Sequence, residues 1–405
     1  MTLRSLLFVG LSLFSLSDAR PLDGTATSTQ QSSPQIRRLG DQRRSRDTLE
    51  GVYARDTEEA QAIDATVYMA DDEIEVAAQG AYPRLAQLSD DSILAVTARS
   101  DSDFRVISTT RSTDQGATFS PLGEVTRSDT ADIDNAFLLP LPSGKILCAF
   151  RNHDQNEAGN YTWYRITVAQ SDDNGKSWTY LTQAAEHAAT DVKNGIWEPF
   201  MRIGKNGEIQ MTYSGELEDD NQETFRIIST DEGKTWTEPK NLRLHSTDEH
   251  FRDGMQSIVP FQLADGTDAL IMVFETVKTD HFLIEYVVSY DDGETWGCRG
   301  EVYNPPQRNA GSPYITKIGD NLAVIFGTDK DVTEEHSPWN SKADSVIVFS
   351  PGLVQNRLSW SSEPLVVSER PSFWPSVLGM ENGSIMALYE RDVVARGRII
   401  SVGEN

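Results

Sequence analysis

The 405-residue sequence is poor in cysteine and in basic residues, and it has no apolar run long enough to cross a membrane. Its two cysteines, Cys148 and Cys298, form no zinc or redox spacing and imply no disulfide, so we expect two buried thiols. Asp and Glu outnumber Lys and Arg by 62 to 36, which gives a formal net charge of −26. Because nucleic acids and anionic membrane surfaces require a basic face, this charge argues against both as partners.

The N-terminal region has the pattern of a processed leader. Residues 3–19, "LRSLLFVGLSLFSLSDA", place a basic residue before a short apolar stretch that ends in small residues, which predicts a signal peptide over 1–19 and a secreted, extracellular protein. Residues 20–60 are rich in Ser, Thr, Gln and Arg and predict a disordered tail or pro-segment. Two sequons, at Asn160 and Asn382, fit a secreted glycoprotein.

One turn motif recurs four times. The copies are "STDQGATF" from 112, "SDDNGKSW" from 171, "STDEGKTW" from 229 and "SYDDGETW" from 289, and their aspartates are 59, 58 and 60 residues apart. Asp and Gly supply the side-chain acceptor and the positive φ of a tight turn, and the aromatic residue that follows can anchor it by packing. A constant period of this length predicts a repeat architecture.

Each turn follows a hairpin and a third strand, and two weaker hairpin copies, from 311 and 373, bring the number of repeats to six. Four antiparallel strands per unit predict an all-β fold, a six-bladed β-propeller over residues 61–405. The sixth repeat lacks its outer strand, which "TVYMADDEIEV" at 66–76 can supply. An elongated β-solenoid is the alternative fold, but its repeats are usually shorter.

The S-x-D-x-G-x-T-W motif resembles the Asp box of sialidase-like proteins, and the resemblance covers residues 66–405. It implies a sialidase-like propeller in which the Asp boxes lie on the outer rim and stabilise hairpins. The chemistry is then expected at the starts of the inner strands and the ends of the second strands, which line the central funnel. The inner-strand candidates are Arg84, Asp134, Asn135, Trp197, Glu198, Arg252, Asp253, Ser312 and Trp374. The second-strand candidates are Arg99, Arg151, His153, Asp154, Glu216, Glu275, Asp329, Glu390 and Arg391.

Two glutamates are the predicted catalytic pair. Glu198, in "IWEPF", lies between a Trp that can stack on a sugar and a Pro that stiffens the strand, and Glu275 ends the strongly apolar "IMVFETV". Desolvation there can raise a carboxyl pKa, as a general acid requires. Two facing carboxylates are the usual requirement of glycoside hydrolysis. The plainer interpretation of each glutamate is a charged residue that closes a strand.

The strings "WEPF", "YSGE", "RDGM" and "FET" resemble those of fungal exo-1,5-α-L-arabinanases of glycoside hydrolase family 93. That resemblance implies release of arabinobiose from the non-reducing end of linear arabinan with retention, and it carries the catalytic pair onto Glu198 and Glu275. We assign Glu198 as nucleophile and Glu275 as acid/base. The predicted substrate-binding residues are Arg84, Asp134, Asn135, Arg151, His153, Trp197, Arg252, Asp253 and Trp374.

Two other functions stay open. An exo-α-sialidase needs three arginines and a tyrosine nucleophile in the last blade; Arg84 fits the first arginine, but the sixth repeat reads "SFWPSV", with Phe373 and Trp374 instead. Arg84 can equally bind sugar hydroxyls or pair with an acidic neighbour. The other alternative is a propeller that binds glycans without cleaving them. We expect a polysaccharide or oligosaccharide substrate, no cofactor, no metal at His153 and Asp154, and a monomer.

Overall fold

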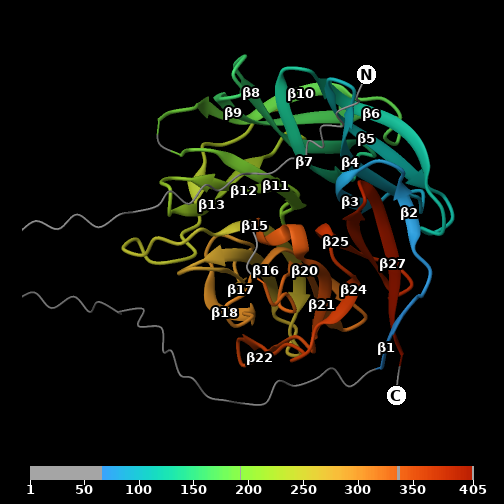
Figure 1. The fold of residues 1–405 in the computed structure, drawn as a ribbon, viewed down its shortest axis with the longest axis vertical. Coiled ribbons are helices and arrows are strands. Elements are labelled where there is room, and N and C mark those ends of the chain that lie inside the picture. The colour runs from blue at the N-terminus through green and yellow to red at the C-terminus, as the bar shows by residue number, and fades with distance from the viewer. Residues whose placement is uncertain (1–65, 192, 335–337, 404–405) are drawn as a thin grey trace, which may run out of the picture. The chain divides into compact units, whose positions relative to one another are not determined.

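Six antiparallel sheets surround one axis in the computed structural model, which describes residues 66–191, 193–334 and 338–403 (Figure 1). The predicted signal peptide and tail, residues 1–60, lie outside these residues. The colours of Figure 1 pass around the ring from blue to red, so the blades follow one another in sequence order. This arrangement confirms the predicted all-β six-bladed propeller.

Blades 1 to 4 share one plan, in which four consecutive strands run from the axis outward. Blade 1 contains β3 (Ala81–Gln87), β4 (Ile93–Asp101), β5 (Phe104–Ser112) and β6 (Ser120–Ser128). Blade 2 contains β7 (Ala131–Pro140), β8 (Ile146–Gln155), β9 (Tyr161–Ser171) and β10 (Thr179–Ala188). Blade 3 contains β11 (Ile196–Ile203), β12 (Ile209–Glu216), β13 (Gln222–Ser229) and β14 (Lys240–Asn241). Blade 4 contains β15 (Gly254–Gln262), β16 (Asp268–Val277), β17 (Phe282–Ser289) and β18 (Gly297–Tyr303).

Blades 5 and 6 depart from this plan. Blade 5 contains β19 (Ala310–Ile318), β20 (Asn321–Thr328), β21 (Asp344–Ser350) and β24 (Leu365–Ser368), with a small hairpin of β22 (Leu353–Val354) and β23 (Arg357–Leu358) where blades 1 to 4 have the Asp motif. A 3₁₀ turn, η1 (Trp339–Lys342), lies between β20 and β21. Blade 6 contains β25 (Phe373–Gly379), β26 (Ile385–Arg391) and β27 (Val394–Gly403), joined by β1 (Thr66–Met69) and β2 (Ile74–Ala77).

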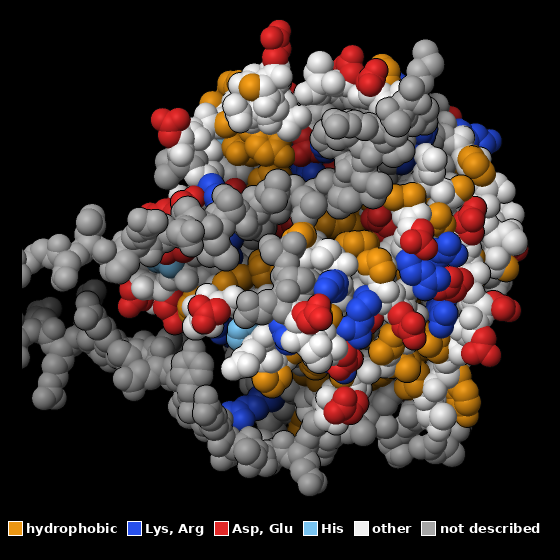
Figure 2. Space-filling model, viewed as in Figure 1, with side chains coloured by type: hydrophobic (Ala, Val, Ile, Leu, Met, Phe, Trp, Pro, Cys, Tyr) orange, Lys and Arg blue, Asp and Glu red, His pale blue; other side chains and the backbone are white. Residues whose placement is uncertain are grey.

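The ring is closed by the predicted N-terminal segment. Thr66 of β1 pairs with Gly403 of β27, and β2 pairs with the same strand further along. Glu73, between β1 and β2, forms ion pairs with Arg391 and Arg396. Figure 2 shows acidic and basic side chains next to each other on the side of the molecule where β27 lies.

Blade-to-blade packing explains why the middle strands read as continuous apolar runs. A strand such as β16 or β20 is covered on both faces by neighbouring blades and is buried along most of its length. The buried hydrophobic residues form six clusters within the described residues, each between two adjacent blades. Burial of these six interfaces is the main stabilising term of the ring.

The repeated motif forms the same hydrogen-bonded turn each time, here called the Asp turn (residues 112–119, 171–178, 229–236 and 289–296). In blade 3, Asp231 accepts hydrogen bonds from the Thr235 backbone N–H at 2.9 Å, the Thr235 hydroxyl at 2.7 Å and the Ser229 hydroxyl at 2.9 Å. Ser229 Oγ in turn accepts from the Gly233 N–H at 2.8 Å, and Trp236 Nε1 donates to the Gly233 carbonyl at 3.0 Å. The bonds of Ser, Asp, Gly and the following Thr or Ser recur in all four turns, whereas the indole bond forms in blades 2 and 3 and the Trp296 indole N–H of blade 4 has no hydrogen-bond partner among the described residues.

Each Asp turn also packs on the preceding blade. In blade 2, the Gly175 carbonyl accepts a hydrogen bond from Thr109 Oγ1 of blade 1 at 3.1 Å. Gly175 has φ of +84°, and a Cβ there would lie 2.7 Å from Leu94 Cδ2. In blade 4, the Gly293 carbonyl accepts from Arg226 of blade 3 at 2.7 Å. The turns therefore fasten neighbouring blades together.

Three smaller predictions concern the surface. Cys148 is buried but Cys298 is exposed, so the expectation of two buried thiols is wrong for Cys298, which lies on the outer strand β18. Asn160 and Asn382 both lie in exposed hairpin turns, and their glycosylation stays a prediction. Within the described residues, no helix has the length and apolar character that crossing a membrane requires.

Candidate active site

A β-bulge near the start of every inner strand defines the funnel. In each blade one extra residue interrupts the pairing of the first and second strands, for example between Trp197 and Phe200 opposite Ser214 and Thr212. One residue of each bulge has φ between 49° and 57°, and these residues are Tyr82, Asn135, Glu198, Met255, Ser312 and Trp374. Non-glycine residues rarely adopt positive φ, and bulges redirect side chains next to functional sites.

A second ring of residues faces the bulges from the second strands. These residues pair with the residue just before each bulge residue, and they are Ala98, Arg151, Ser214, Glu275, Gly327 and Glu390. The Asp turns follow the third strands at the opposite end of each blade, since Ser112 pairs with Ile93 at the start of β4. The bulge residues and this second ring together line the funnel.

Glu198 occupies the bulge position of blade 3. Its Oε2 accepts hydrogen bonds from the Ser214 hydroxyl at 2.9 Å and from the backbone N–H of Met255, the bulge residue of blade 4, at 3.1 Å. Burial raises the pKa of Glu198, while the two donors act in the opposite direction by stabilising the carboxylate. The side chain is half-buried, so it remains accessible from the funnel.

Glu275 occupies the second-ring position of blade 4 and is also half-buried. Its Oε2 accepts one hydrogen bond, from the backbone N–H of Ser312, the bulge residue of blade 5, at 2.6 Å. Burial raises the pKa of Glu275 to about 8, and the charge of Glu198 adds to the shift. Both predicted catalytic glutamates therefore lie at the funnel on adjacent blades, and the Glu275 carboxyl group has one hydrogen-bond donor where that of Glu198 has two.

Arg151 is the positively charged residue that blade 2 contributes to the second ring of the funnel. Its guanidinium donates to Asn135 Oδ1 at 3.1 Å and lies 3.2 Å from Asp132 and 3.5 Å from Asp134. Asp134 is half-buried beside the bulge, and Asn135 is 5% exposed at it. Arg151 is thereby held by three neighbours, with its positive charge near Glu198.

Trp197 forms an aromatic wall next to Glu198. The ring is half-buried, and it contacts His153, Tyr161 and Tyr164 edge-on at centroid distances of 4.9 to 6.0 Å. His153 is 0% exposed, and burial lowers its pKa to about 3, so it is a neutral packing partner of Trp197. A direct substrate contact by His153, as predicted, does not fit this placement.

Arg84 lies in the floor of the funnel rather than at its rim. It is 3% exposed, its guanidinium carbon lies 3.7 Å from the Tyr82 ring centroid and 5.1 Å from that of Tyr314, and it donates to the Trp374 carbonyl at 3.4 Å. Trp374 itself is half-buried at the bulge of blade 6. Of these two predicted binding residues, Trp374 therefore reaches the funnel and Arg84 supports it from below.

Arg252 and Asp253 precede the bulge of blade 4 and are engaged elsewhere. Arg252 pairs with Glu216 at 2.7 Å, and Asp253, 0% exposed, pairs with Arg299 at 2.8 Å and with His245 at 3.0 Å. Burial disfavours the charged form of Asp253, but His245 and Arg299 still hold its pKa below the usual range. The predicted sugar contact therefore does not fit Asp253, which ties blade 4 to the segment before it.

Sequence reasoning missed Tyr82, Ser214 and Met255 as funnel residues and did not select Glu390 for the site. Tyr82 is the bulge residue of blade 1, two positions before the predicted Arg84. Alignment of the six hairpins on the extra residue, rather than on charged residues, could have found these positions.

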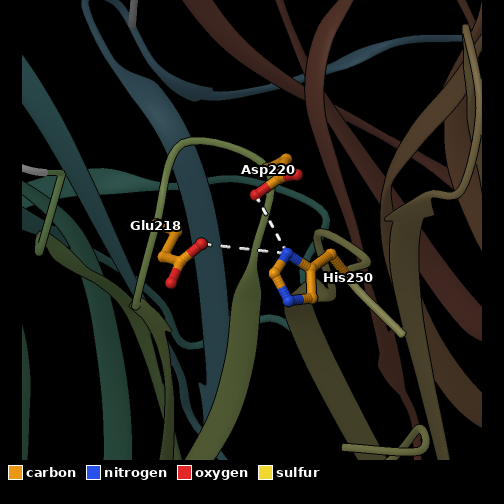
Figure 3. A group of neighbouring side chains, drawn as sticks. All are labelled: Glu218, Asp220 and His250. Atoms are coloured by element: carbon orange, nitrogen blue, oxygen red, sulfur yellow. Dashed lines mark hydrogen bonds and ion pairs between the residues drawn. The ribbon is translucent and has the colours of Figure 1, made fainter. Parts of the chain in front are cut away.

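A possible cation site lies outside the funnel. Figure 3 shows Glu218 and Asp220 pointing toward His250, whose Nδ1 lies 3.8 Å from Glu218 and 3.3 Å from Asp220. All three side chains are exposed, and their ligand atoms lie within 4.8 Å of one another. Exposed groups of this kind are common without a metal.

Comparison with known proteins extends the description of the fold. The sequence matches no family model and no curated protein. An α-L-arabinanase of Penicillium chrysogenum complexed with arabinobiose is similar in structure, with a TM-score of 0.60 and 17% identity over 83% of this chain and 98% of that chain. The α-L-arabinofuranosidase of Fusarium graminearum bound to an iminosugar inhibitor has the same TM-score and identity over 80% of this chain and 96% of that one.

A sialidase of Streptococcus pneumoniae is also similar, with a TM-score of 0.54 and 14% identity over 83% of this chain and 70% of that chain. Likeness at these identities shows the fold. The six-bladed propeller of this chain is therefore similar in fold to the glycoside hydrolase family 93 α-L-arabinofuranosidase and to the sialidase.

Proposed function

We propose that the protein is an exo-acting glycoside hydrolase that releases arabinobiose from the non-reducing end of linear 1,5-α-L-arabinan with retention. The observation that carries the proposal is the pair Glu198 and Glu275, two half-buried carboxyl groups on adjacent blades. Each accepts a hydrogen bond from the backbone of the next blade, so the bulges fix both groups. The structural likeness to a complex with arabinobiose supports a neutral pentose substrate.

The two glutamates take different roles because their surroundings differ. Glu198 has two donors that favour its carboxylate, so it attacks the anomeric carbon and forms a glycosyl ester. Glu275, with a pKa of about 8, keeps its proton at neutral pH and gives it to the departing glycosidic oxygen. It then takes a proton from the water that hydrolyses the ester, which restores both groups and retains the configuration.

The experiment compares hydrolysis of linear arabinan and of a sialoside by wild type, Glu198→Gln and Glu275→Gln. Each substitution keeps the side-chain shape and removes the ionisable group, so the protein should fold while turnover of arabinan falls on the order of 10²–10⁴-fold. The double variant should lose little more than the worse single variant, since both groups act on one transition state. NMR of the first-formed product reports retention.

The same assay separates the alternatives. Sialoside cleavage without arabinan cleavage would replace the proposal by a sialidase, although Trp374 stands where the sialidase tyrosine is expected. Binding of arabinan oligosaccharides without hydrolysis of either glycan would indicate a glycan-binding propeller. Full activity of both Gln variants would move the reaction away from this pair.

We also propose that the protein is secreted, on the basis of the apolar segment at 3–19, and that the secreted protein is a monomer. After expression in a secreting host, the mature chain should begin after Ala19 or after an arginine pair in 37–44, and it should elute as a monomer. An intracellular product with an intact N-terminus would contradict secretion.

A further inference from the structure

A third carboxyl group of the funnel has no role in the proposed reaction. Glu390 of β26 pairs with Phe373, just as Glu275 of β16 pairs with Gly254, so the two glutamates occupy equivalent places in blades 6 and 4. Glu390 is half-buried. The Glu275 carboxyl group accepts a backbone hydrogen bond from the next blade. The Glu390 carboxyl group has no hydrogen bond or ion pair with any residue that the structure describes.

Neither oxygen of Glu390 is sealed from solvent, so this half-buried carboxyl group at a funnel position is open to a ligand group as its hydrogen-bond partner. Burial raises the pKa of Glu390 to about 7, and the negative charge of Asp134 adds to this shift. At mildly acidic pH the group is therefore protonated and can both donate and accept hydrogen bonds, as a sugar hydroxyl requires of its partner.

The funnel positions next to Glu390 are small. The neighbouring second-ring positions are Gly327 in blade 5 and Ala98 in blade 1, and the Trp339 ring lies 4.0 Å from where a Cβ of residue 327 would stand. Trp374, half-buried at the bulge of blade 6, supplies aromatic surface, and Tyr82, which is 7% exposed, packs beside it with the ring centroids 6.0 Å apart. Asp134 lies on the other side of blade 1. Aromatic surface flanked by acidic hydrogen-bonding groups suits a neutral sugar with free hydroxyl groups.

We propose that Glu390 and Asp134, on either side of Tyr82, form a hydroxyl-binding subsite that selects a neutral sugar ring. The subsite rests on the proposed function, because it holds the sugar that Glu198 and Glu275 process. Glu390 is a specificity-determining residue in this arrangement and takes no part in bond breaking. A sugar that carries a carboxylate would meet Glu390, which has no ion pair with the described residues, beside an Asp134 whose charge is shared with Arg151, and it is disfavoured.

The test measures kcat and KM on arabinan oligosaccharides and, by calorimetry, direct binding of arabinobiose and of a sialoside. Glu390→Ala removes the hydroxyl partner and should raise KM and the arabinobiose dissociation constant about tenfold, the usual effect of one lost hydrogen bond, with kcat changed less than threefold. Glu390→Gln can still donate and accept, so it should restore KM to within about threefold of wild type. Glu390→Asp has a shorter side chain, so its KM should lie between those of the Ala and Gln variants. It also provides a test if the alanine variant does not fold.

Glu381→Ala is the matched control, because Glu381 is exposed in the β25–β26 turn at the opposite end of the same blade. It should leave KM and binding unchanged. If wild type binds and cleaves arabinan oligosaccharides but Glu390→Ala and Glu390→Asp keep the wild-type KM, the subsite is refuted while the proposed function stands. If wild type binds the sialoside more tightly than arabinobiose, or binds no arabinobiose, both fail. A fall in kcat at constant KM would also overturn the subsite.

Discussion

The two ends of the blades use carboxyl groups in opposite ways. At the outer end, hydrogen bonds from the Thr235 N–H and hydroxyl lower the pKa of Asp231 to about 2. At the funnel, burial raises the pKa of Glu275 to about 8 and that of Glu390 to about 7. Hydrogen-bond donors surround the Asp231 carboxylate. Among the described residues, the Glu275 carboxyl group has one donor and the Glu390 carboxyl group has none.

This difference separates groups that stabilise from groups that react. An aspartate whose oxygens are saturated by its own turn stays ionised and has no capacity for chemistry. A glutamate that is desolvated and under-bonded is destabilising in the charged form, but it can exchange a proton near neutral pH. The following predictions test whether the two ends are separable in this way.

The largest effect is expected from the ionisation of Glu275. Because Glu275 must be protonated to donate, kcat/KM on arabinan should fall about tenfold per pH unit above about pH 8. A pH–rate profile of the wild type measures this limb. A profile that stays flat to pH 9.5 would remove Glu275 as the general acid.

The same shift has a consequence for stability. The folded state keeps a proton on Glu275 between about pH 4.3, where an unfolded glutamate titrates, and about pH 8, so the free energy of unfolding decreases as pH rises through this window. Glu275→Gln should therefore raise Tm on the order of 2 °C at pH 8 and leave it unchanged at pH 4. The same Tm difference at both values would contradict this linkage.

The next effect concerns blade packing at the outer end. Gly175→Ala puts a Cβ against Leu94 at a residue with φ of +84°, and it should cost roughly 2–4 kcal/mol of unfolding free energy. Gly144→Ala is the control, since its φ is +89° but no atom lies within 4 Å of the added Cβ, so it should cost about 1 kcal/mol. Urea unfolding measures both free-energy losses, and their difference separates packing against Leu94 from backbone strain. Equal losses for the two variants would mean that packing of the Asp turns does not stabilise the contact between blades.

The smallest effect is expected at one Asp turn. Asp231→Ala removes the acceptor of three hydrogen bonds and should lower the unfolding free energy by roughly 1–2 kcal/mol, with kcat at low temperature unchanged. Asp265→Ala, which removes an acceptor from the Thr267 N–H in an exposed hairpin turn, should have a smaller effect on Tm. If the folded Asp231→Ala variant lost turnover, the Asp turns would contribute to catalysis, and the two ends of the blades would not have separate roles.

The blades were predictable because their signals are local and repeated. The period of the Asp turns, the apolar middle strands and the missing outer strand of the sixth repeat together predict six blades closed by residues 66–76. Glu198 was selected because it lies between Trp197 and a proline, and Glu275 because its carboxyl group follows a strongly apolar strand, a pattern that indicates burial of a charge.

The register of the funnel was less predictable. Arg84 and Asp253 were predicted to contact the substrate, but each lies two positions along the chain from the bulge residue of its blade, which is Tyr82 or Met255. Tyrosine and methionine have no preference for positive φ, so their residue types do not mark the extra residue, and only alignment with the other hairpins could locate it. Ion pairs between distant segments, such as that of Asp253 with Arg299, also have no local signal.

The pairing of Thr66 with Gly403 determines which blade can fold last during synthesis on the ribosome. Blades 1 to 5 can form one after another as their consecutive strands emerge, because each is made from a continuous stretch of chain. β1 emerges before all of them and has no partner until β27 has been translated. The nascent chain therefore carries an unpaired edge strand throughout elongation, and a chaperone that covers this edge would shield the growing chain from aggregation.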